Sequence, residues 1–142
     1  MIQTIRRLWI QRFSLVQKPW ENRHLSTEQL GEVGEQIAAD YLLLQHCAIL
    51  KRDFKPRHGG QVDLVFQDDQ ALVFCEVKTR TSQEHFRAFF AVDKGQQHRI
   101  RKSANLWRRE LEPLEVPVRF DIIEVYLEPK IKPLCYWFKD AF

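Results

Sequence analysis

Two apolar, β-rich runs separated by four polar residues most constrain what this chain can fold into. Residues 62–66 and 71–79 are rich in branched and aromatic side chains, and Gln-Asp-Asp-Gln at 67–70 joins them. This pattern predicts an antiparallel hairpin. Three charged residues, Asp63, Glu76 and Lys78, interrupt runs that otherwise have the composition of a protein core. Charges placed in core-like strands need a partner or a function.

The three charges are expected to meet at one end of the hairpin. Side chains alternate between the two faces of a strand, so Glu76 and Lys78 share a face with Leu72 and Phe74. Pairing through the turn brings Asp63 opposite Glu76. Two carboxylates and an ammonium group therefore converge on two adjacent strands.

This set of groups has the chemistry that phosphodiester hydrolysis requires. Mg²⁺ prefers oxygen ligands, and Asp63, Glu76 and the backbone carbonyl of Val77 can supply them. Lys78 can orient or activate the attacking water and stabilise the charged transition state. The alternative is a purely structural ion pair between Glu76 and Lys78.

A helix is expected over residues 27–45. Ser26 and Gln29 have the spacing of a capping box, and a core stripe follows at Leu30, Val33, Ile37, Tyr41 and Leu44. Glu35 lies on a neighbouring stripe with Gly31, Ala38 and Leu42. The small residues allow the helix to approach a sheet closely, so Glu35 can reach the same metal ion directly or through water. The alternative for Glu35 is an acid favoured by the helix dipole.

The remaining periodicity predicts an α/β protein in the order α-β-β-β-α-β, with a central mixed sheet flanked by helices. Further strands are expected at 48–54, 118–127 and 134–138, and a second helix at 95–111. Residues 26–142 form one domain. Residues 1–25 are a basic extension, either an amphipathic helix or a frayed arm, and one hypothesis makes this segment a docking element for a partner.

Several classes of protein are disfavoured. The apolar runs are too short for a membrane span, and we expect no signal peptide. Cys47, Cys75 and Cys135 are far apart, and the five His form no pair at metal-ligand spacing. We therefore expect a cytoplasmic protein with reduced thiols, no membrane partner and no small-molecule cofactor.

Basic residues surround the predicted site, although the net charge of the chain is only +3. They flank the hairpin, follow Lys78 and recur along the second helix, at Arg52, Lys55, Arg57, Arg80, Arg99, Arg101 and Lys102. Such residues contact phosphates without sequence preference. The sequence therefore predicts DNA as a partner; the alternative for the helix is an ordinary solvated face.

Three segments resemble the YraN-like family of small bacterial endonuclease-like proteins. These are Gly34-Glu35 with Ala38-Ala39 and Tyr41-Leu42, the run from Gly60 to Val65, and the run from Val73 to Arg80. That family is similar to archaeal Holliday-junction resolvases and belongs to the PD-(D/E)xK nuclease class. The resemblance extends from about residue 30 to the C-terminus.

The resemblance implies a restriction-endonuclease-like fold and DNA cleavage dependent on Mg²⁺ or Mn²⁺. It implies a catalytic set of Glu35, Asp63, Glu76 and Lys78, with the three acids as metal ligands. Similarity to resolvases also implies a homodimer, and branched or damaged DNA as a substrate.

The sequence departs from the family pattern at two positions. Gln61 stands where the family usually has Glu, so it can bind water at the site but adds no charge. Gln96 stands where the second helix usually has Lys. We assign Gln61 and Gln97 supporting roles. The Gln61 departure favours the alternative function, a nucleic-acid-binding module that keeps the fold but cleaves poorly or not at all.

Overall fold

The computed structural model describes residues 6–9, 25–81, 92–111, 115–128 and 132–142. Its elements are, in order, β1 (Arg6–Trp9), α1 (Thr27–Leu44), β2 (Ala48–Phe54), β3 (Val62–Asp68), β4 (Ala71–Arg80), α2 (Lys94–Glu110), β5 (Val118–Tyr126) and β6 (Leu134–Phe138). From α1 onward the order is the predicted α-β-β-β-α-β, with the candidate strand at 134–138 present as β6, and the α/β fold class is confirmed.

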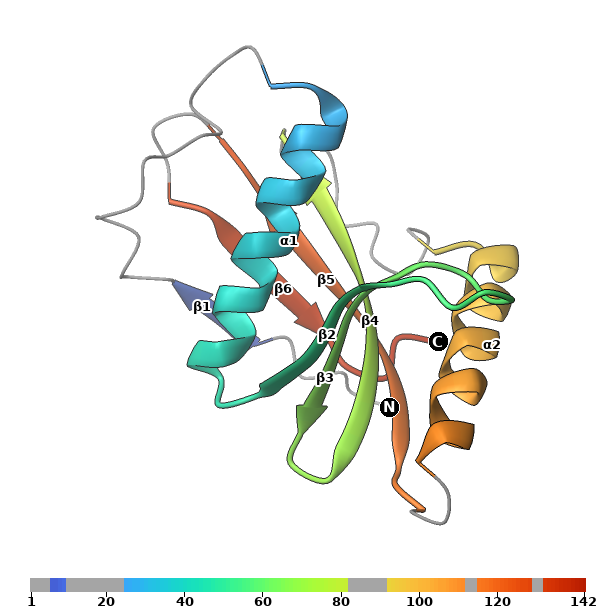
Figure 1. The fold of residues 1–142 in the computed structure, drawn as a ribbon. Helices are drawn as coiled ribbons and strands as arrows, with labels where there is room; N and C mark the ends of the chain where they lie inside the picture. Colours follow the sequence, from blue (N-terminus) through green and yellow to red (C-terminus); the bar gives the residue numbers. More distant parts are fainter. Residues whose placement is uncertain (1–5, 10–24, 82–91, 112–114, 129–131) are drawn as a thin grey trace.

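The strands form one mixed sheet in the order β1-β6-β5-β4-β3-β2. The central pair, β4 and β5, is parallel, and the other pairs are antiparallel. Figure 1 shows α1 on one side of the twisted sheet and α2 on the other. Each helix covers its own apolar cluster, because alternate residues of the central strands face opposite sides.

The predicted hairpin is present, with a tighter turn than the four-residue connection expected. Gln67 and Asp68 still pair with Leu72 and Ala71, so Asp69 and Gln70 alone make the turn. Asp69 has a φ of 56°, a left-handed conformation that Asp tolerates. The register puts Leu64 opposite Cys75 as the last pair, so Asp63 and Glu76 are the next residues along the two strands.

Beyond this point the two strands of the hairpin part. The pairing of β3 with β4 ends at Leu64 and Cys75, whereas β4 stays paired with β5 as far as Arg80. The far ends of β2 and β3 reach across to α2 (Figure 1). There the N–H of Gly60 donates to the Arg99 carbonyl at 3.3 Å, and the Ser103 hydroxyl donates to the Gly60 carbonyl at 2.7 Å. The sheet therefore opens between β3 and the second half of β4.

Two expectations need correction. Residues 6–9 form the edge strand β1 on β6 rather than part of a helix, because the β6 edge offers backbone partners; the rest of 1–24 lies outside the described residues. Leu44 is 49% exposed rather than part of the core stripe, because it is the last residue of α1; Leu42 is buried in its place. The Ser26–Gln29 capping box is present as predicted.

Among the described residues, no helix is long and apolar enough to cross a membrane. Cys47, Cys75 and Cys135 are all buried free thiols. Burial raises the pKa of Cys47 to about 11 and that of Cys135 to about 12, which makes both thiols unreactive.

Candidate active site

Asp63 lies where β3 and β4 separate. The residue is 8% exposed, and its Oδ2 atom accepts a hydrogen bond from the Val77 N–H at 2.7 Å. The carboxylate thus replaces the strand partner that Val77 loses. Burial raises the pKa of Asp63 to about 8, and the charge of Glu76 adds to the rise, although the Val77 hydrogen bond opposes it.

Glu76, on β4, lies close to Asp63 of β3 and is 7% exposed. Its Oε1 atom accepts from Lys78 Nζ at 2.9 Å and from Gln96 Nε2 at 2.7 Å. Gln96 reaches it from the first turn of α2, a position fixed by the Asp93 cap, which accepts the Gln96 N–H at 2.8 Å. Glu76 and Lys78 share the α2 face of the sheet, as the alternation predicts.

Glu35 reaches the same region from α1, on the opposite face. Gly34 makes this possible, because a Cβ atom at that position would overlap Thr79 Oγ1 on β4. Burial raises the pKa of Glu35, and the charges of Asp53 and Glu76 add to the rise. The charge of Glu35 also raises the pKa of Asp63, so the three acids form one electrostatic cluster.

The cluster is not a preformed metal cage. Within the described part of the chain, no three His, Cys, Asp or Glu side chains lie close enough to hold one ion together. Glu76 is held by Lys78 and Gln96, and Asp63 by Val77. Carboxylate oxygens are nevertheless the donors that Mg²⁺ and Mn²⁺ prefer, and Lys78 is the one cation bonded to the cluster among the described residues. The donor set therefore fits a divalent ion.

The structure describes both predicted supporting glutamines. Gln97 donates to the Val92 carbonyl at 3.0 Å, a contact that fixes the start of α2, and its supporting role stays a prediction. Gln96, one residue earlier, is the glutamine that contacts Glu76. A helix turns by about 100° per residue, so neighbours face different directions. Gln61 is exposed just before β3.

Some of the basic residues predicted to contact phosphates are exposed near α2, and the others interact with side chains of the fold. Arg57 lies on the loop whose Gly60 contacts α2, where Arg99 and Lys102 are also exposed. Lys55 lies on the same loop, but its ammonium group forms an ion pair with Asp53 at 3.0 Å. Arg52 is exposed on β2, but its guanidinium donates to Gln36 of α1 at 2.6 Å.

Arg80 and Arg101 are engaged within the fold. Arg101 lies over the rings of Phe120 and Phe142, at 5.4 and 5.5 Å from their centroids. Arg80 Nη2 lies 4.0 Å from Oε1 of the buried Glu124.

Glu124 is a residue that the sequence analysis missed. It is fully buried on β5 and pairs in register with Lys78 on β4. The available signal was the one that marked Asp63 and Glu76, a charge within an apolar run, here Ile122 to Leu127.

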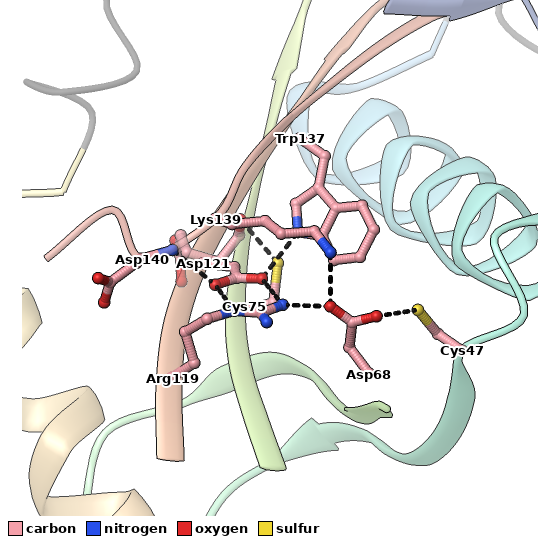
Figure 2. A network of polar contacts seen from close by, with 9 residues as sticks. Cys47, Asp68, Cys75, Arg119, Asp121, Trp137, Lys139 and Asp140 are labelled. Atoms are coloured by element: carbon pink, nitrogen blue, oxygen red, sulfur yellow. Dashed lines mark hydrogen bonds and ion pairs between the residues drawn. The ribbon is translucent and has the colours of Figure 1, made fainter. Parts of the chain in front are cut away.

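A second polar cluster lies at the other end of the sheet, on the α1 face (Figure 2). Asp121 accepts from Arg119, from Trp137 Nε1 at 2.8 Å and from the Asp140 N–H at 3.0 Å. Asp68 accepts from Arg119 at 2.8 Å and from Lys139 at 2.6 Å. Every charge in this cluster has an opposite partner, so it joins the C-terminal residues to the hairpin rather than forming a reactive site.

Fold and site together define a small α/β protein with a carboxylate–lysine cluster where two strands of a mixed sheet part. The model of the "Uncharacterised protein family UPF0102" matches residues 34–125, and the chain belongs to this family, the YraN family of the sequence analysis.

Relatives of this family match over most of their length. The UPF0102 protein of Trichlorobacter lovleyi is 40% identical over 116 residues, covering 81% of this chain and 91% of its own. That of Symbiobacterium thermophilum is 35% identical over 116 residues, covering 82% and 98%. A solved structure of Pyrococcus furiosus SfsA in complex with Ca²⁺ matches with 18% identity and a TM-score of 0.33, covering 80% of this chain and 64% of that one. This last likeness is too weak to indicate a shared function.

Proposed function

We propose that this protein is a divalent-metal-dependent endonuclease that hydrolyses DNA phosphodiester bonds. The observation that carries the proposal is the pair of buried carboxylates, Asp63 and Glu76, beside Lys78 at the point where β3 leaves β4. Two buried acids with a raised pKa on one of them are costly to the fold, which is typical of a functional site.

Asp63 and Glu76 would hold an Mg²⁺ or Mn²⁺ ion, with Glu35 acting through water. When bound, the ion would neutralise negative charge on the phosphate. Lys78, whose side chain is 25% exposed, can hold the attacking water by a hydrogen bond and stabilise the developing charge. The exposed basic residues of that loop and of α2 would hold neighbouring phosphates without reading bases.

Cleavage of a DNA panel tests the proposal. Linear, forked, flapped and four-way DNA are incubated with the wild-type protein and Mg²⁺ or Mn²⁺. We expect nicking that is strongest on branched DNA and falls by about 100-fold or more in Asp63→Asn and in Lys78→Ala. Asp69→Asn is the matched control, because it makes the same change in the exposed turn at the other end of the hairpin. Cleavage that survives both site changes contradicts the proposal.

A second candidate is a nucleic-acid-binding module with the same fold and no cleavage. The contacts that hold Glu76, from Lys78 and Gln96, favour it, because the carboxylate already has partners without a metal. This candidate predicts salt-dependent DNA binding that Asp63→Asn leaves unchanged, with no Mn²⁺ binding by calorimetry.

A further inference from the structure

Glu124 is a buried carboxylate next to the proposed site. It is 0% exposed and lies on the α2 face of β5, directly beside Lys78 in the parallel β4–β5 register. The side chains of register partners in a sheet point the same way. Lys78 therefore stands between two acids, Glu76 two residues before it on its own strand and Glu124 on the next.

One oxygen of Glu124 accepts no hydrogen bond from the residues that the structure describes. The Oε2 atom accepts from the Tyr126 hydroxyl at 3.0 Å, whereas the Oε1 atom is buried and has no such donor among the described residues. Arg80 Nη2, on a side chain that is 36% exposed, forms a long ion pair with that oxygen at 4.0 Å but does not donate a hydrogen bond to it. A buried acceptor left unsatisfied is costly, and such an atom needs an explanation.

The charges around Lys78 explain why this oxygen of Glu124 is left without a hydrogen bond. In the structure Lys78 bonds Glu76 at 2.9 Å. A cation on Glu76 would withdraw this acceptor and repel the ammonium group. Glu124 is then the acid that faces Lys78 across the β4–β5 register, and its Oε1 atom is already buried, so a bond to it requires no further desolvation of the acid.

We propose that Glu124 is a positioning residue that receives Lys78 when Glu76 is no longer available as its partner, as when Glu76 binds a cation. The lysine then changes partner across the β4–β5 pair while staying in the site. This inference rests on the proposed function for its role in catalysis, but the change of partner itself can be tested without metal or DNA.

Double-mutant cycles in urea unfolding provide the test. The coupling between Lys78→Met and Glu124→Gln is measured in the wild-type background and in Glu76→Ala. Lys78 and Glu124 pair only in the second background, so we expect their coupling in the unfolding equilibrium constant to be about tenfold larger there. Glu76→Gln, which removes the charge and keeps the shape, gives the same comparison if Glu76→Ala does not fold.

The matched control is the pair Lys139 and Asp68, bonded at 2.6 Å in the other polar cluster. Its coupling, measured with Lys139→Met and Asp68→Asn, is expected to be equal in both backgrounds. Equal coupling of Lys78 with Glu124 in both backgrounds overturns the inference. A merely structural role for Glu124 would produce that result, because its contribution would not depend on Glu76.

Calorimetry with Mn²⁺ links the change of partner to the site. We expect Glu124→Gln to weaken Mn²⁺ binding about tenfold, because the displaced ammonium then has an uncharged amide oxygen in place of a carboxylate, and Lys78→Met in the same chain to restore it. A wild-type protein that binds no Mn²⁺ contradicts the proposed function. Even then, a larger coupling between Lys78 and Glu124 in the Glu76→Ala background, measured without metal, supports the change of partner.

Discussion

Asp63 meets two requirements with one side chain. Its carboxylate accepts the Val77 N–H where β3 no longer pairs with β4, and it lies against Glu76 in a buried position. Asparagine would accept the same hydrogen bond without a charge. The fold alone therefore does not need an acid at this position, which supports a role for the carboxylate in chemistry.

The raised pKa of Asp63 predicts a pH dependence of stability. The folded state holds a proton on this group up to about pH 8, whereas the unfolded state releases it near 3.8. The stability due to Asp63 is therefore complete below about pH 4 and is lost as the pH rises to about 8, by at most about 1.4 kcal/mol per unit.

Urea unfolding of the wild type and of Asp63→Asn across pH 4–9 checks this prediction. The free energy of unfolding of the variant is expected to rise relative to that of the wild type as the pH rises from about 4 to 8. Above about pH 8 the difference between the two is expected to stay constant. Curves that stay parallel throughout would show that Asp63 has an ordinary pKa in the folded protein.

At the scale of elements, the contact of α1 with β4 positions Glu35. Gly34 faces Thr79 with no room for a Cβ atom, whereas a Cβ atom at Gly31, three residues earlier, would meet nothing within 4 Å. The helix approaches the sheet at one glycine and stands clear of it at the other. The two glycines therefore form a matched pair for testing the contact.

We expect opposite effects from the same substitution at these glycines. Gly34→Ala pushes α1 away from β4 and destabilises the protein by about 1–3 kcal/mol. Gly31→Ala adds helix propensity in open space and stabilises it by about 0.5–1 kcal/mol. Denaturant unfolding measures both, and a neutral Gly34→Ala would show that the close approach is not required.

At the scale of the whole molecule, the ends of the sheet have different roles. At one end β3 and β4 part and leave charges without full partners. At the other end Asp68 and Asp121 bind Arg119, Trp137, Lys139 and the backbone of Asp140 (Figure 2). Burial alone would raise the pKa of Asp68, but hydrogen bonds from Lys139 and Arg119 lower it, as expected of a stabilising cluster.

Removal of Asp121 is expected to destabilise the whole fold. Asp121→Ala leaves the Trp137 N–H and the Asp140 N–H without an acceptor and takes one of two carboxylates from Arg119, a loss of about 3–5 kcal/mol. Asp140→Asn is the control, because only the backbone of Asp140 takes part. A loss below about 1 kcal/mol in urea unfolding would contradict the structural role of the cluster.

The order of the elements could be predicted because it depends on local patterns. Strand alternation, the hairpin turn and the Ser26 cap act over a few residues, and the structure has β2, α1 and β6 within about one residue of the predicted bounds. The edge strand at 6–9 could not be predicted, because its partner β6 lies more than 120 residues away in the chain.

The sequence by itself determined which charges interrupt the core, and on which strands Asp63, Glu76 and Lys78 lie. Only the tertiary structure decided that Gln96 rather than Gln97 contacts Glu76, that Arg101 packs on aromatic rings, and that Glu124 stands beside Lys78. The reason is physical. Periodicity fixes the face of an element on which a residue lies, whereas contacts across the sheet depend on how elements far apart in sequence pack.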